Sequence, residues 1–180
     1  MRVKLALLAF FLLASQVRAE AEISEIKISL DGDRVLASFT LRDAFDRRLS
    51  ERVDSGLPTS ILYRFELAHD RKRWWDHKLK KSTLEIVTMY DAVGRAYTIN
   101  YKLDDKLIES RTVHERKALE EAMTVIDRLP VFSLAGLPPG WRLLIKVEAE
   151  MGSRTILSFI PVTISTDWRE SPKFHPPRQP

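Results

Sequence analysis

Apolar and polar residues alternate along most of the chain, the period-two pattern of strands that bury one face. The first case lies between residues 23 and 41, where two alternating runs flank Asp31-Gly32-Asp33. Because Asp-Gly between such runs is a strong hairpin signal, this segment predicts a β-hairpin.

Further alternating runs cover residues 59–68, 84–90, 97–103 and 107–111, with turn residues between them. This succession predicts an antiparallel meander that is covered on one face. A last hairpin is expected over residues 141–164, with its turn at Met151-Gly152-Ser153. Pro161 has no N–H to donate, so the returning strand is expected at a sheet edge or at a bulge.

Two segments change to helical spacing. In the short one, Asp43 is the expected cap, Phe45, Leu49 and Val53 form the apolar stripe, and Gly56 is expected in the left-handed conformation after the last turn.

The longer helix is expected to begin with a capping box and to end at a proline. Its capping box is Thr112 and Glu115, and its end is Pro130. Its apolar stripe comprises Leu119, Ala122, Met123, Ile126 and Leu129.

These elements predict a mainly β fold, a meander with a sandwich-like two-layer core, with one short and one longer amphipathic helix. The alternative is an α+β fold with the helices on one face of an antiparallel sheet.

The N-terminus has the pattern of a secretory signal peptide. Arg2 and Lys4 precede ten apolar residues, Leu5–Ala14, and Val17-Arg18-Ala19 supplies small residues at a cleavage site. Ten residues are too few to span a bilayer, which takes about 20. We therefore expect a signal peptide over residues 1–19 and export to the periplasm, with an uncleaved N-terminal anchor as the alternative.

A single β-rich domain is expected over residues 20–169, and the four prolines that follow predict a flexible tail over residues 170–180. Three of the 29 basic residues and none of the 25 acidic ones lie before residue 20, so cleavage would reduce the net charge from +4 to +1. This small excess does not favour nucleic acid as a partner. The chain has no cysteine, so disulfides cannot stabilise it.

One ordered series of motifs resembles a known family. It consists of Gly56-Leu57-Pro58, an alternating strand that ends at Glu66-Leu67, Arg73-Trp74-Trp75-Asp76, and then Tyr90 and Tyr97. This series resembles the domain-of-unknown-function 4390 family of small exported bacterial proteins. At residues 91–94 the chain has Asp-Ala-Val-Gly where that family tends to have a His-x-Leu-Thr-like turn. The family has no assigned activity, so the resemblance implies export and fold and no catalytic residue.

Sequence spacing indicates no catalytic, metal or cofactor site. The four histidines show no metal-ligand spacing, although His69 and His77 could meet across a hairpin. There is no Gly-x-Ser-x-Gly motif, and Asp104-Asp105 falls at an expected hairpin tip, where aspartates commonly serve the geometry of the turn.

The stretch RKRWWDHKLKK, residues 71–81, is the candidate binding site. In a strand, Trp75, His77 and Leu79 would share one face, and Trp74, Lys78 and Lys80 the other. The apolar phase then changes, which predicts a turn or bulge within residues 80–83. One interpretation is an edge strand that lysines protect from pairing. The other is a surface strip for anionic groups, formed by Arg71, Lys72, Arg73, Trp74, Lys78 and Lys80.

Three hypotheses about function follow. The favoured one is a non-catalytic binding or accessory module of the bacterial envelope, whose partner is another envelope protein or an anionic membrane surface. The second is a hydrolase-type enzyme with a site assembled from distant residues. The third is a structural component of an envelope assembly that pairs through a sheet edge. The sequence does not indicate an oligomeric state.

Overall fold

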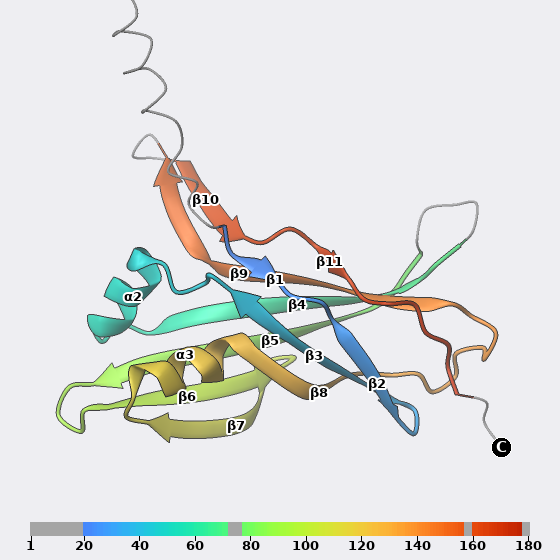
Figure 1. The fold of residues 1–180 in the computed structure, drawn as a ribbon, viewed down its shortest axis with the longest axis horizontal. Coiled ribbons are helices and arrows are strands. Elements are labelled where there is room, and N and C mark those ends of the chain that lie inside the picture. Colours follow the sequence, from blue (N-terminus) through green and yellow to red (C-terminus); the bar gives the residue numbers. More distant parts are fainter. Residues whose placement is uncertain (1–19, 72–76, 157–159, 178–180) are drawn as a thin grey trace, which may run out of the picture.

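The protein is a sandwich of two antiparallel β-sheets (Figure 1). A computed structural model describes residues 20–71, 77–156 and 160–177, and the predicted signal peptide lies outside these ranges. No helix within the described ranges is long and apolar enough to cross a membrane.

The larger sheet has the strand order β10-β9-β4-β5-β6-β7, and β11 also pairs with β9. Its strands are β4 (Thr59–His69), β5 (His77–Asp91), β6 (Ala96–Leu103), β7 (Lys106–Val113), β9 (Leu143–Ile156), β10 (Ile160–Ser165) and β11 (Arg169–Glu170). All pairings are antiparallel, which confirms the predicted meander from β4 to β7.

The smaller sheet is built around β3 (Arg34–Arg42). β1 (Glu22–Ile23) and β2 (Lys27–Asp31) pair with different parts of β3, and β8 (Val125–Ser133) also pairs with it. The predicted first hairpin is thus confirmed as β2 and β3, with Gly32 at a φ of 59° in its turn.

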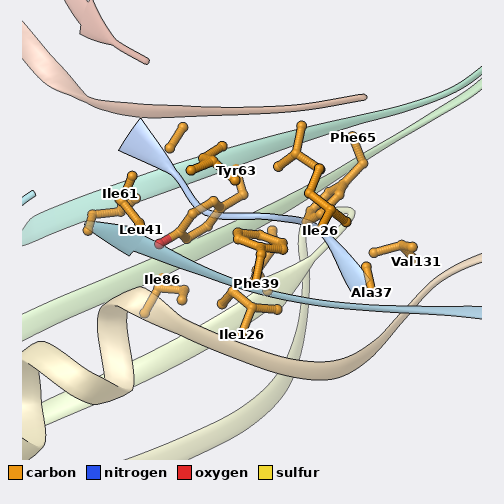
Figure 2. Packing of buried hydrophobic residues seen from close by; sticks show 14 of the residues in the cluster. Ile26, Ala37, Phe39, Leu41, Ile61, Tyr63, Phe65, Ile86, Ile126 and Val131 are labelled. Atoms are coloured by element: carbon orange, nitrogen blue, oxygen red, sulfur yellow. The ribbon is translucent and has the colours of Figure 1, made fainter. Parts of the chain in front are cut away.

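The core lies between the two sheets, where aromatic side chains meet (Figure 2). The ring of Phe39 on β3 lies 5.5 Å from that of Tyr63 and 6.0 Å from that of Phe65, both on β4. The predicted inward row of β4 is confirmed, because Ile61, Tyr63, Phe65 and Leu67 are all buried.

The short helix α2 (Arg47–Asp54) begins later than predicted. Asp46, and not Asp43, caps it, because the Asp46 side chain accepts a hydrogen bond of 2.9 Å from the Leu49 N–H. Asp43 instead has a φ of 54° in the preceding turn. The C-terminal prediction is confirmed, since Gly56 has a φ of 75°.

The longer helix is shorter than predicted. α3 covers Arg116–Thr124, and the chain then continues as β8, so the predicted stripe residues Ile126 and Leu129 lie in a strand and not in the helix. The predicted capping box is wrong, because Thr112 belongs to β7 and the N-cap residue Glu115 makes no side-chain cap bond.

Two tyrosines of the larger sheet explain where α3 ends. The Tyr63 hydroxyl donates a hydrogen bond of 2.8 Å to the carbonyl of Met123, and the Tyr101 hydroxyl donates one of 2.8 Å to that of Ala122. These carbonyls belong to the last turn of the helix, where backbone acceptors lack helical partners. Pairing with β3 then takes over from residue 125, and Pro130 is tolerated because β8 is an edge strand.

The predicted turn at residues 151–153 is a bulge instead. β9 continues to Ile156, with Glu150 opposite Ser165 and Ser153 opposite Thr163, so β9 has one residue more than β10 over this stretch. Gly152 has a φ of 105°, which a bulge accommodates as well as a turn. The prediction for Pro161 is confirmed, because β10 lies at the sheet edge.

The C-terminal segment extends the larger sheet beyond the predicted boundary at residue 169. The Leu143 N–H donates to the Phe174 carbonyl at 2.8 Å, and the Phe174 N–H donates to the Leu143 carbonyl at 2.9 Å. Ser171 is buried and bonds the backbone of Ile145. The free edge of β9 therefore holds the chain as far as Phe174, within the stretch predicted to be a flexible tail.

Candidate functional site

The candidate site is the end of the larger sheet where β4 finishes and β5 begins. His69 and His77 are paired opposite each other there. In Figure 1 this end lies away from both helices. Five residues of the predicted strip region fall outside the described part of the chain, among them Lys72, Arg73 and Trp74.

A β-bulge divides the lysines of the predicted strip. Ala68 pairs with Lys78 and Leu67 with Lys80, so Leu79 is the extra residue, one position before the predicted window. Because paired residues share a face, Lys80 lies on the inner face with buried Leu67, and Lys78 lies on the outer face. The prediction that the two lysines share one face is therefore wrong.

Each of these lysines already has a partner within the protein. Lys78 forms an ion pair with Glu66 on the outer face. The Lys80 ammonium donates a hydrogen bond of 2.6 Å to the Ser133 carbonyl, and so links β5 to β8 of the other sheet. Arg71 and Lys81, by contrast, are exposed and form no hydrogen bond or ion pair with any described residue.

An ion cluster joins this end of the sheet to the C-terminal segment. Asp70 Oδ2 lies 2.5 Å from Arg142 Nε and 2.7 Å from Lys173 Nζ. The hydrogen bond from Lys173, together with the charge of Arg142, holds the pKa of the Asp70 carboxyl below its ordinary range. The carboxylate therefore stays charged and connects three segments that are distant in sequence.

An aromatic pair accompanies these charges. The indole of Trp141 stacks on the His69 imidazole, with ring centroids 4.4 Å apart and an interplanar angle of 8°. Trp141 is partly exposed, so a tryptophan forms part of the surface at this end of the sheet.

Sequence reasoning missed Trp141, Arg142 and Lys173 as site residues. The adjacent Trp-Arg pair is the one signal that could have found the first two. Lys173 carries no such signal, because only the pairing of the C-terminal segment with β9 places it there.

The basic end is thus defined by six cations and two carboxylates, a local excess of positive charge. The cations are Arg71, Lys78, Lys80, Lys81, Arg142 and Lys173, and the carboxylates are Glu66 and Asp70. This local excess of four positive charges is larger than the net charge of +1 predicted for the cleaved chain, so the rest of that chain would carry a net negative charge.

Three surface grooves lie away from the basic end. One of 270 Å³ is lined by Trp168 and three carboxylates, Glu20, Glu22 and Asp167. Others of 320 Å³ and 130 Å³ lie beside β3 and α2, and no histidine lines any of the three. Within the described ranges, no three His, Asp or Glu side chains come together as metal ligands, although His69 and His77 face each other as the sequence suggested.

Comparison with known proteins gives one result. The model of a domain of unknown function, DUF4390, matches residues 18–173, which is most of the chain. No curated protein and no solved structure matches. The chain therefore belongs to the DUF4390 family, as the series of motifs from Gly56 to Tyr97 indicated.

Proposed function

We propose that the protein is an exported, non-catalytic binding module of the bacterial envelope, and that its basic end binds an anionic phospholipid surface. The observation that carries this proposal is the gathering of six cations and Trp141 at one end of the larger sheet. They come from β5, from the segments that follow β4 and precede β9, and from the C-terminal segment. Export is supported by the signal-peptide pattern of residues 1–19.

The chemistry of the basic end suits lipid headgroups. Each Lys or Arg close to an anionic membrane contributes about 1 kcal/mol of attraction, and tryptophan is favoured at the boundary between headgroups and acyl chains. Arg71 and Lys81 form no hydrogen bond or ion pair with a described residue, so they can bind a phosphate without breaking one. Lys80 is engaged with the Ser133 carbonyl, so it contributes mainly through its charge.

The proposal is tested by vesicle sedimentation at low and high salt, with vesicles of phosphatidylglycerol and phosphatidylcholine and with vesicles of phosphatidylcholine alone. We expect binding to the anionic vesicles that salt weakens. The double variant Arg71→Glu/Lys81→Glu should lose about tenfold or more in affinity, because it reverses two free cations.

A matched control reverses two exposed cations on the helices, Arg48→Glu and Lys117→Glu, which changes the net charge by the same amount. This control should bind nearly as well as wild type. Equal losses in both double variants would mean that net charge and not the basic end drives binding, and binding that salt does not weaken would contradict the proposal. If the protein does not bind lipid but captures an acidic protein, the partner of the basic end is a protein and not a membrane.

Export is tested separately by fractionation of the producing cells and N-terminal sequencing. We expect a periplasmic protein that begins at Glu20. A cytosolic protein that retains residues 1–19 would refute this part of the proposal.

A further inference from the structure

Strand β7 leaves one side of the larger sheet open. It pairs with β6, and no described strand pairs with its other side. Seven of its eight residues are exposed, including Leu107 at 62% and Ile108 at 50%. An edge with exposed apolar residues and unpaired backbone groups is a template for another strand.

The other free edges are less suited to pairing. β8 contains Pro130 and β10 contains Pro161, and proline cannot donate a ladder hydrogen bond. β2 has five residues and β11 has two, whereas β7 has eight and no proline. Its protective features are the charges of Lys106, Glu109 and Arg111 and a bulge at Ile108, where Tyr101 pairs with Glu109 and Lys102 with Leu107.

We propose that β7 pairs with β7 of a second copy of this chain, antiparallel, about a two-fold axis at Ser110. In this register Glu109 lies opposite Arg111 of the partner subunit, and Arg111 lies opposite Glu109 of the partner subunit. Opposite charges directly across an antiparallel ladder stabilise the pairing, and like charges destabilise it. The sequence of β7 is therefore complementary to itself.

The structure places both side chains on one face of the sheet, as this pairing requires. Glu109 pairs with Tyr101 and Arg111 with Ile99, so the two charges lie on the same face of the sheet. They form an ion pair along the strand, and the Arg111 guanidinium lies 5.2 Å from the centre of the Tyr101 ring. This contact places the Arg111 guanidinium over the face of the sheet that Glu109 shares.

Charge also selects the register. An axis at Glu109 would place two carboxylates opposite each other, and an axis at Arg111 would do the same with two guanidinium groups. With the axis at Ser110, Ile108 lies opposite Thr112 of the partner subunit, and the second sheet would cover part of its exposed side chain. Leu107 lies beyond the bulge, on the face of Lys102, and does not share a face with Val113. The ladder is short, so we expect a reversible dimer.

The test is sedimentation velocity on the processed protein, obtained by expression of the full chain, from about 1 µM to about 100 µM. Wild type should shift from monomer to dimer as concentration rises. Glu109→Arg and Arg111→Glu should each stay monomeric, because each creates like-charge pairs across the axis. The swapped variant E109R/R111E should dimerise again, which also shows that the charge reversals do not unfold the protein.

The matched control is Lys27→Glu, a charge reversal on the free edge of β2 in the other sheet. It should dimerise as wild type does. The proposal is overturned if wild type stays monomeric, if the single variants dimerise normally, if E109R/R111E stays monomeric, or if K27E abolishes the dimer. This inference does not rest on the proposed lipid binding and is measured without lipid.

Discussion

Removal of the Tyr63 hydroxyl tests how α3 is joined to the larger sheet. In Tyr63→Phe the Met123 carbonyl loses a donor at 2.8 Å, and both residues are fully buried. Because water cannot replace this donor, we expect the free energy of unfolding to fall by about 1–3 kcal/mol. Tyr101→Phe removes the matching bond to Ala122 at a position that is less completely buried than Tyr63, so the loss there should be about 0.5–1.5 kcal/mol.

The same tyrosine predicts how stability depends on pH. Burial raises the pKa of Tyr63 well above its ordinary value of 10. In the unfolded chain this hydroxyl ionises as the pH passes 10, whereas in the folded protein it stays neutral. Its contribution is therefore fully present below pH 10 and decreases as the pH rises toward the folded pKa, by about 1.4 kcal/mol per pH unit.

The assay is urea unfolding of wild type, Tyr63→Phe and Tyr101→Phe at pH 7 and at steps above pH 10. Tyr63→Phe should be the less stable variant at pH 7 and should lose less stability than wild type above pH 10. The reasoning is refuted if Tyr63→Phe costs less than Tyr101→Phe, or if its alkaline slope equals that of wild type. An unchanged m-value would show that the unfolded states are comparable.

Two further predictions concern local structure. Gly56→Ala should lower the free energy of unfolding in urea by about 1–2 kcal/mol, because alanine would have to adopt the left-handed conformation of Gly56, with its Cβ 3.4 Å from the Tyr90 carbonyl oxygen. The control Gly140→Ala should be nearly neutral, because a Cβ there would lie in open space. Asp70→Asn should speed amide hydrogen exchange at Phe174. Because the pKa of Asp70 is lowered in the folded protein, exchange at Phe174 in wild type should speed up only as the pH falls below the ordinary carboxyl value of 3.8. Equal exchange rates in wild type and Asp70→Asn at pH 7 would contradict this role of the carboxylate.

Strand positions were predictable where a period of two was matched by a turn signal. The β2–β3 hairpin and the inward row of β4 follow from local residues alone. The end of α3 was not predictable, because Ile126 and Leu129 fit the helical stripe as well as they fit a strand. Distant hydroxyl groups and the pairing of β8 with β3 decide that boundary.

The candidate site was predictable only in part, for the same reason. The change of phase near Lys80 revealed a bulge, but a one-residue error in its position moves a side chain to the other face. Arg142 and Lys173 join the basic end through long-range pairing with Asp70. No local sequence pattern predicts such contacts.

The two proposed surfaces have a joint geometric consequence. β7 runs parallel to β5, because each pairs antiparallel with β6, and β5 begins at the basic end. A two-fold axis through Ser110 reverses the partner subunit, so the two basic ends of a dimer would lie at opposite ends of the joined sheet. Such a dimer cannot press both basic ends against one flat membrane, but it can bridge two membranes.

Wild-type protein should therefore cluster anionic vesicles, which raises turbidity, at concentrations where it dimerises. Glu109→Arg should bind vesicles without clustering them, since it keeps the basic end and loses the β7 pairing. The swapped variant E109R/R111E has the same net charge as wild type and should cluster vesicles again. Arg71→Glu/Lys81→Glu should dimerise in solution and yet neither bind nor cluster vesicles. Clustering by Glu109→Arg as strong as that by wild type would show that bridging does not pass through β7, because a monomer with one basic end holds only one membrane.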